Sequence, residues 1–526
     1  MRRLQPIIWL QGVISRQGAA SDRNPLRREI LNLMAATIDR LLRMCRRLTS
    51  IIIGISCAAI LLVTPLSDST TTSLAAPAHP MRRVNCPYFG SDVTDRFAEG
   101  AIFWFGRVTR QTNYADVRIG YFDSQLWVYV AVFDRRLWYD TSPSADDLNR
   151  WDAVTLYLDT AGNTGTAPTT STYRFVAQLS GDSDARYRLA QRGNGVAWQT
   201  QPIQFTTVPG WRGNAFNDNA DDRGWAMTFQ IPFASLGVGT PHGQRWGIAL
   251  QVHDRDDAGG TYIPDQVWPE GMSAQQSATW AQLHFGLPVH SPGPLAIRSR
   301  AVVYQRDANG SEVPDGAVGG YTTCGEGMDF WTEWGERVYY KFPDSTEEYG
   351  DFNIQNQSDV ADWPCFSRYY VTFPLPARPA GMQVVTASLT MHLFGGAGDV
   401  DDRTDSLIQV LTVAEDWDER TLNWNNAPLA LENVSQRWVQ PVRGPVDWPG
   451  IPYAWDIGYA VAKAYAAGQS YLRLAVYSAD SAYHSGKYFV SADTGDWNAA
   501  GCPRLEVAFG EPFEVTHRAF LPLVRR

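Results

Sequence analysis

Charged side chains are scarce in this sequence of 526 residues, where Asp, Glu, Lys and Arg together make up 19%. The 55 acidic residues outnumber the 45 basic ones, so the formal net charge is −10. A nucleic-acid-binding surface needs clustered Lys and Arg to neutralise phosphates. The charge balance therefore argues against a nucleic-acid partner.

Histidine and the common catalytic motifs are also missing or rare. Only eight His are present, and no H-E-x-x-H, G-x-S-x-G, P-loop or G-x-G-x-x-G occurs in a usable context. The sequence therefore gives no support to a metal-dependent or nucleophile-based hydrolase. A glycoside hydrolase needs only two carboxylates at a suitable separation, so that enzyme class stays open.

Long apolar runs are absent, apart from a stretch too short to span a bilayer comfortably. This stretch, 51–63, follows Arg46 and Arg47 and precedes the small-residue sequence 73–76. A charged region, an apolar region and a small-residue cleavage site are typical of an export signal. We therefore predict a signal peptide over 44–76 and a secreted or cell-surface protein without a stable membrane span. Residues 1–43 match no module and form an upstream extension, untranslated if Met44 is the start.

Cysteine is limited to six residues, of which Cys45 and Cys57 would leave with the signal. Four remain, and in an oxidising compartment an even number suggests two disulfides. Cys324 and Cys365 form the favoured pair because both lie in one loop-rich stretch, whereas Cys86 and Cys502 cannot be assigned. No Cys or His spacing indicates zinc.

Aromatic residues are abundant, at 12% with 20 Trp and 23 Tyr, and many fall in alternating segments. In 151–159 (WDAVTLYLD), Val154, Leu156 and Leu158 alternate with Thr155 and Tyr157, which is the pattern of a half-buried strand. The same alternation occurs in 125–134, 225–231 and 246–254. Repeated short alternating strands predict a first antiparallel β-sandwich over 93–286.

A second sandwich is predicted over 300–510, after a Pro-rich linker at 287–299. Its expected strands are 388–393, 406–413, 471–478, 487–491 and 504–509. One short helix is expected at 457–467, with Asp456 as its N-cap and Gly468 ending it. The sequence thus predicts an all-β, jelly-roll-like chain of two domains, with a short tail at 511–526.

The order of segments in the first sandwich resembles carbohydrate-binding module family 9. The segments that carry the resemblance are QLWVYVAVFDRRL from 125, WDAVTLYLD from 151, YRF from 173, FQIPFASLG from 229, WGIALQVHDRDD from 246 and WAQLHFG from 280. The resemblance implies a cleft in which two Trp rings grip a sugar and polar side chains from the strands bind its hydroxyls.

The resemblance assigns the ligand-binding positions to five residues. Arg174 and Gln251 fall where the polar groups lie, and Trp151 stands within a residue or two of one clamp position. Thr155 replaces the acidic side chain that usually enters the cleft. No Trp matches the second clamp near 274–275, and Trp268 from the same loop is the expected substitute. On the predicted alternation, these side chains share the open face of the first sandwich.

The second sandwich resembles the extracellular DNRLRE-type domain, also described as carbohydrate-binding family 96. The motif is WDERTLNWNNAP over 417–428, followed by the helix after Asp456 and by PRL at 503–505. The expected role of the motif is structural, with Glu419 and Thr421 fixing a turn while Trp417 and Trp424 pack beneath it. Modules of this kind serve in display, adhesion or polysaccharide binding.

Three loops rich in side-chain oxygens suggest calcium as the one cofactor to test, although solvated turns explain each loop as simply. They are Asp254, Asp256 and Asp257; Asn217, Asn219, Asp221 and Asp222; and Asp399, Asp401, Asp402 and Asp405.

The sequence as a whole predicts an exported, non-catalytic protein that binds a polysaccharide or cell-surface glycan. The alternatives are a surface spacer or adhesin without a sugar site, and a glycoside hydrolase or its accessory subunit.

Overall fold

The computed structural model describes residues 79–91, 96–303, 313–320, 327–339, 349–356 and 365–513. These residues belong to one compact unit that begins at His79. Strands dominate it, which confirms the predicted all-β class. In the described part of the chain, no helix is both long and apolar enough to cross a bilayer.

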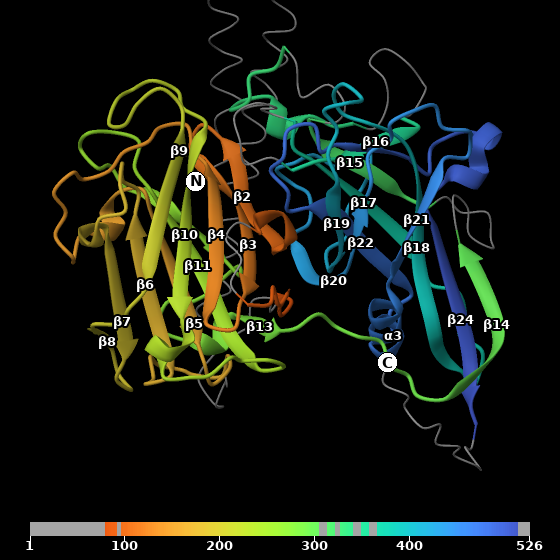
Figure 1. The fold of residues 1–526 in the computed structure, drawn as a ribbon, viewed down its shortest axis with the longest axis horizontal. Helices are drawn as coiled ribbons and strands as arrows, with labels where there is room; N and C mark the ends of the chain where they lie inside the picture. Colours follow the sequence, from red (N-terminus) through yellow and green to blue (C-terminus); the bar gives the residue numbers. More distant parts are fainter. Residues whose placement is uncertain are drawn as a thin grey trace, which may run out of the picture. The chain divides into compact units, whose positions relative to one another are not determined.

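The first module consists of two sheets packed face to face (Figure 1). One sheet has the order β2-β3-β4-β10-β9, with bounds β2 Ala101–Thr109, β3 Thr112–Tyr121, β4 Gln125–Phe133, β10 Gly224–Pro232 and β9 Thr206–Arg212. The other has β13-β11-β5-β6-β7-β8, with bounds β13 Ala281–Phe285, β11 Arg245–Asp254, β5 Ala153–Asp159, β6 Thr172–Gln178, β7 Arg188–Gly193 and β8 Trp198–Thr200; β12 Ile263–Trp268 pairs with β11. Short 3-10 helices occur at Phe97–Glu99, Leu148–Arg150, Ala185–Tyr187, Phe233–Leu236 and Ser277–Thr279.

Alternation in the sequence explains how these sheets pack. Val154, Leu156 and Leu158 of β5 are fully buried in the core between the sheets, as the period of two predicts. The strands predicted at 125–134, 225–231 and 246–254 are β4, β10 and β11, each within a residue or two of its expected bounds.

The second module is also built from strands, with one short helix. Its strands are β14 Leu295–Val303, β15 Asp315–Gly319, β16 Asp351–Ile354, β17 Ser367–Pro374, β18 Gln383–Gly396, β19 Ser406–Val413, β20 Ala430–Val439, β21 Ile451–Asp456, β22 Tyr471–Ser478, β23 Lys487–Val490 and β24 Arg504–Pro512. Two 3-10 helices lie at Trp334–Glu336 and Asp496–Gly501. Strands β14-β24-β18-β23-β16 form one sheet, with β21 on β18, and β15-β17-β22-β19-β20 form another.

The predicted helix is α3, Gly458–Ala466. The N-cap is Ile457, one residue later than the predicted Asp456, and it makes no side-chain capping bond. The Asp456 carboxylate, just before the cap, accepts a hydrogen bond from Gly458 N at 2.9 Å, and Gly468 follows the helix with a left-handed φ of 69°. The local signals in the sequence therefore locate both ends of the helix.

Strand β1, Arg83–Cys86, joins the two modules into one thirteen-stranded sheet. It pairs in parallel with β13 of the first module and, at Arg83, with β20 of the second. The predicted linker is correspondingly shorter than expected, because residues from Leu295 onward already belong to β14. The modules are thus connected by a shared strand as well as by a covalent link.

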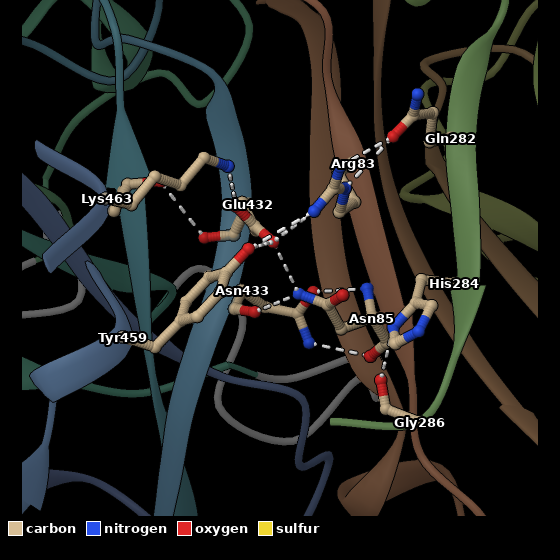
Figure 2. Close-up of polar contacts among 10 residues, drawn as sticks. Arg83, Asn85, Gln282, His284, Gly286, Glu432, Asn433, Tyr459 and Lys463 are labelled. Atoms are coloured by element: carbon tan, nitrogen blue, oxygen red, sulfur yellow. Dashed lines mark hydrogen bonds and ion pairs between the residues drawn. The ribbon is translucent and has the colours of Figure 1, made fainter. Parts of the chain in front are cut away.

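Polar side chains hold β1 against β20, as Figure 2 shows. Asn85 N donates to Asn433 Oδ1 at 2.7 Å, and Asn433 Nδ2 donates back to Asn85 O at 2.8 Å. The buried Glu432 carboxylate accepts from Asn85 Nδ2 at 3.1 Å and forms an ion pair with Lys463. Because each of these buried groups has a partner, the contact between β1 and β20, which we call the joint, stabilises the fold as well as connecting the two modules.

A buried arginine marks a second contact between the modules. Arg368 of β17 donates to the Tyr114 hydroxyl of β3, and its guanidinium lies 3.8 Å from the Trp424 ring centroid. Trp424 is buried in the same hydrophobic core as Phe133 of the first module. The expected packing of Trp424 is therefore observed, and the ring serves the contact between modules as well as its own turn.

The cysteines differ from the expectation of two disulfides. Cys86 and Cys502 are free thiols, each buried in a different part of the chain. Burial raises the pKa of the Cys502 thiol to about 12 and that of Cys86 well above its usual value, so neither is a reactive thiolate. Cys324 lies outside the described residues, so its pairing with the buried Cys365 stays a prediction.

Candidate functional site

The candidate site lies on the side of β5, β6, β7 and β11 that faces away from the sandwich core. We call it the polar face and define it by Tyr157, Arg174, Gln191, Trp198 and Gln251. Tyr157, Arg174 and Gln191 occupy one cross-strand row, because the strand registers pair each with the next. Side chains directly opposite each other on neighbouring strands lie on the same face. The sheet register thus gathers residues from five strands, β5, β6, β7, β8 and β11, into one patch.

A chain of hydrogen bonds fixes the part of the polar face nearest β12. The Tyr157 hydroxyl donates to Gln251 Oε1 at 2.9 Å, and Gln251 Nε2 donates to Asp265 Oδ2 at 2.6 Å. His253 Nδ1 lies 3.1 Å from the other Asp265 oxygen, and His253 Nε2 lies 2.8 Å from Thr155 Oγ1. Gln251 is therefore held in one orientation.

Aromatic rings border this network. Trp198 lies with its ring centroid 6.0 Å from that of Tyr157, and Tyr157 lies 5.4 Å from Trp280. The Arg174 guanidinium stands 5.8 Å from the Trp198 centroid. Burial raises the pKa of Tyr157 to about 12, an effect that the nearby Arg174 opposes, so the hydroxyl stays protonated and able to donate at neutral pH.

Two buried polar atoms of the polar face lack partners. Arg174 Nε and Gln191 Oε1 are shielded from solvent, and neither has a hydrogen-bond partner among the residues that the structure describes. A buried donor or acceptor left without a partner costs about 1–3 kcal/mol. Both residues are half-buried as a whole, so a ligand could reach only the solvent-facing parts of their side chains, where a guanidinium donates to hydroxyls and an amide both donates and accepts.

The structure brings three of the five predicted ligand residues, Arg174, Gln251 and Thr155, to this side of the sheet. Arg174 and Gln251 belong to the polar face itself. Thr155 is on the same side, but it is buried and bonded to His253. Trp151 is half-buried at the start of β5, where its ring lies against the loop at Gly260.

The prediction for Trp268 is wrong, because this ring is in the core. It is only 1% exposed, and its centroid lies 4.1 Å from that of Phe103 on the opposite sheet. The register pairs Trp268 with Leu250, and cross-strand partners point to the same side. Because Leu250 is fully buried in the core between the sheets, Trp268 lies there too.

Sequence reasoning missed Trp198, Gln191 and Asp265. Trp198 begins β8, which has only three residues, too few to show an alternation. Asp265 lies in the irregular strand β12, where its contact with β11 depends on a register that no local pattern reveals.

A separate hollow of about 390 Å³ lies on the other sheet of the first module. Its lining includes Phe97, Tyr129, Trp211 and Arg212, together with Ser481 of the second module. This hollow does not overlap the polar face.

A carboxylate cluster lies at the ends of β4 and β11. Oxygen atoms of Asp134, Asp254 and Asp256 lie within 4.8 Å of one another. Burial, together with the neighbouring carboxylates, raises the pKa of Asp254 to about 7 and that of Asp134 well above its usual range. Two members, Asp254 and Asp256, were predicted from sequence as a calcium loop, and Asp134 completes the group. Asp257 instead accepts a backbone bond within its own turn, from Gly259 N at 2.8 Å.

Comparison with known proteins gives one match to a protein family. Residues 346–501 match the profile of carbohydrate-binding module family 96, which agrees with the resemblance seen in the second module. No curated protein matches the chain.

Solved structures of low sequence identity also match. A carbohydrate-binding module family 9 from Caldicellulosiruptor kristjanssonii in complex with cellotriose is 16% identical, with a TM-score of 0.29, and the match covers 41% of this chain and all of that one. The structure of a family 9 module from the same organism in complex with glucose is also 16% identical, with a TM-score of 0.29, and the match covers 40% of this chain and all of that one. A putative carbohydrate-binding protein from Bacteroides uniformis ATCC 8492 is 13% identical, with a TM-score of 0.31, over 39% of this chain and 99% of that one.

Proposed function

We propose that this chain is an exported, non-catalytic protein that binds a polysaccharide or cell-surface glycan through the polar face of its first module. The observation that carries the proposal is the pair of half-buried polar side chains, Arg174 and Gln191, which lie opposite each other in the strand register, with the Arg174 guanidinium 5.8 Å from the Trp198 ring centroid. The family 96 match over 346–501 supports a carbohydrate-related role for the second module.

The chemistry of the polar face fits a sugar better than an apolar or anionic ligand. Gln251 is held rigidly by Tyr157 and Asp265, so little side-chain entropy is lost when it binds a hydroxyl. Asp265 contributes negative charge that disfavours an acidic ligand. Trp198 supplies an apolar plate for the C–H face of a pyranose.

The experiment is titration of the full exported chain with a panel of soluble oligosaccharides in a calorimeter. Arg174→Ala should weaken binding by about tenfold or more, because a hydrogen bond to a charged group contributes about 1.5–3 kcal/mol. Arg192→Ala is the matched control, since Arg192 is an exposed neighbour on β7 whose Nε already donates to Thr170 O.

Equal affinity of the two variants would refute the polar face as the binding site. Hydrolysis of an oligosaccharide during the titration would instead favour the glycoside hydrolase alternative. An Arg174→Ala chain that loses stability as well would show that the guanidinium serves the fold.

Export is part of the proposal and rests on the sequence from Arg46 to Ala76. Mass spectrometry of the mature protein should find an N-terminus at or after Pro77. A mature chain that retains residues upstream of Met44 would contradict it.

Calcium stays a proposal as well, and the carboxylate cluster is the place to test it. Three carboxylate oxygens at close range suit a hard cation with oxygen ligands. Calcium would act as a brace between the ends of β4 and β11, away from the polar face.

A further inference from the structure

The hollow of about 390 Å³ lies on the outer face of the sheet β2-β3-β4-β10-β9, where the second module stops covering the first. The second module covers β3 on this face, since Arg118 Nε donates to Ala479 O at 2.6 Å. The hollow begins beside Ser481 and extends over β4, β10 and β9. Ligand pockets commonly measure about 300–1,000 Å³ and occur preferentially at boundaries between domains. The hollow therefore has the size and the setting of a small-molecule site.

Small residues form the floor of the hollow. The strand register places Ala226 of β10 opposite Gly210 of β9, and both line the hollow. A Cβ atom built on Gly210 would have only the Cβ of Ala226 within reach, at 4.0 Å. Gly210 does not adopt a left-handed conformation, so the backbone does not require glycine at this position. The missing side chain leaves open space that a ligand can fill.

Aromatic rings form the walls of the hollow. On the side of β4, Phe97 and Tyr129 stand edge to face with their ring centroids 4.7 Å apart. On the side of β9, Trp211 is 41% exposed, and its ring centroid lies 4.5 Å from that of Phe216. Rings on both sides of a small-residue floor suit a ligand that is itself a flat apolar ring.

Charge in the hollow is of one sign. Of the described residues that line it, Arg212 alone is charged. The Arg212 guanidinium has no ion pair or hydrogen bond with any residue in the described ranges. The buried Arg118 guanidinium, 5.3 Å from the Tyr129 ring centroid, likewise has no ion pair within the part of the chain that the structure describes. A hollow with a half-buried, unpaired cation and no carboxylate in its lining favours an anion.

The donors in the hollow limit which anion fits. One guanidinium matches one carboxylate, because the two groups form a pair of parallel hydrogen bonds. A phosphate or sulfate group offers more oxygens than Arg212 and the Ser481 hydroxyl can satisfy. A sugar acid would press several hydroxyls against rings that offer them few partners, which costs free energy. A single carboxylate on an aromatic ring avoids both costs.

We propose that the hollow binds a small aromatic monocarboxylate, whose ring lies over Gly210 and Ala226 and whose carboxylate pairs with Arg212. This site uses the opposite sheet of the first module from the polar face. It adds a second ligand class to the chain and does not depend on glycan binding.

The test is ligand-observed fluorine NMR of the full exported chain with para-fluorocinnamate. Para-fluorocinnamyl alcohol keeps the ring without the carboxylate, while glucuronate and inorganic phosphate compete as anions without an aromatic ring. The variants are Arg212→Gln, which removes the charge, and Gly210→Val, which fills the floor. The matched controls are Arg107→Gln, an exposed arginine of β2 outside the hollow, and Gly239→Val, another glycine at which an added Cβ meets no clash. Arg174→Ala reports on the polar face.

We expect the anion to bind roughly tenfold or more tightly than the alcohol, because a hydrogen bond to a charged group is stronger than one between neutral groups. Arg212→Gln should weaken binding of para-fluorocinnamate by a similar factor. Gly210→Val should abolish binding, because its methyl groups occupy the space of the ligand ring. The melting temperature of each variant should match that of its control.

Several results overturn the inference. They are no binding of para-fluorocinnamate to the unmodified chain, equal affinity of Arg212→Gln and Arg107→Gln, and equal affinity for the anion and the alcohol. Displacement by glucuronate or phosphate at equal concentration also overturns it. A loss of binding confined to Arg174→Ala would place the aromatic acid on the polar face instead. If Gly210→Val does not fold, Arg212→Gln decides the question alone. The glycan proposal is unaffected by these outcomes, because calorimetry with oligosaccharides tests it separately.

Discussion

Replacing Trp268 with alanine should destabilise the first module. The side chain is 1% exposed and packs between the sheets against Phe103, so the substitution leaves a large cavity. Substitutions of buried Trp or Phe by Ala cost about 3–5 kcal/mol. Trp268 Nε1 is buried without a partner among the described residues, and removing such a group recovers part of the cost. We therefore expect Trp268→Ala to lower the free energy of unfolding by about 3 kcal/mol, at the lower end of that range.

The measurement is urea unfolding followed by fluorescence, together with calorimetric melting. For a module of this size, about 3 kcal/mol corresponds to a fall in melting temperature of roughly 6–12 °C. Trp438→Ala, on the exposed surface of β20, should change stability by no more than about 0.5 kcal/mol.

The opposite result would refute the packing argument. If Trp268→Ala keeps its unfolding midpoint but loses affinity for sugar, Trp268 is a clamp in a binding cleft, and the register that pairs it with Leu250 is wrong.

Three further predictions concern the joint, the carboxylate cluster and the cysteines. Asn433→Ala should cost about 2–4 kcal/mol in unfolding free energy, since it leaves the buried Asn85 N and O unpaired; a change below about 0.5 kcal/mol would show that β1 does not bind the modules. The raised pKa of Asp254, about 7, means that the folded state keeps a proton that the unfolded state loses, so stability should fall as pH rises from about 4 to 7. Added calcium should raise the melting temperature more at pH 8 than at pH 5. If the melting temperature with calcium equals that with chelator at both pH values, the calcium proposal is contradicted. Non-reducing peptide mapping of the exported protein should recover Cys324 linked to Cys365, with a contribution of about 3–4 kcal/mol on the loop-entropy model; free thiols in both peptides would end that prediction.

Much of the fold could be predicted from the sequence because large apolar residues alternate with smaller or polar ones along its strands. In β5 and β11 every second residue faces the core, so the hydrophobic pattern alone gives each strand and the orientation of its side chains. The helix could be located because its end signals are local: Asp456 accepts a bond from the first residue of the helix, and Gly468 adopts the left-handed conformation just after its last turn. Such local signals do not depend on what the rest of the chain does.

The parts that could not be predicted depend on pairings between distant segments. Trp268 follows an irregular strand, and only its register against Leu250 shows which way it points. Trp448 lies in a turn and Trp497 in a 3-10 helix, neither segment has a repeating pattern, and the two residues are 49 positions apart, so their contact follows from tertiary structure alone. The Arg174 and Gln251 assignments came from family resemblance, and the structure adds the neighbours Gln191, Trp198 and Asp265 that no sequence pattern contains.

Strand β1 changes what a cut in the chain would do. It precedes the first module in sequence but pairs with both modules, so severing the backbone at 287–294 would leave the halves attached through Asn85 and Asn433. A protease that nicks this segment should yield two bands on a denaturing gel and one species in gel filtration. A second half expressed alone from a gene divided there would expose the edge of β20 as an unpaired, aggregation-prone strand.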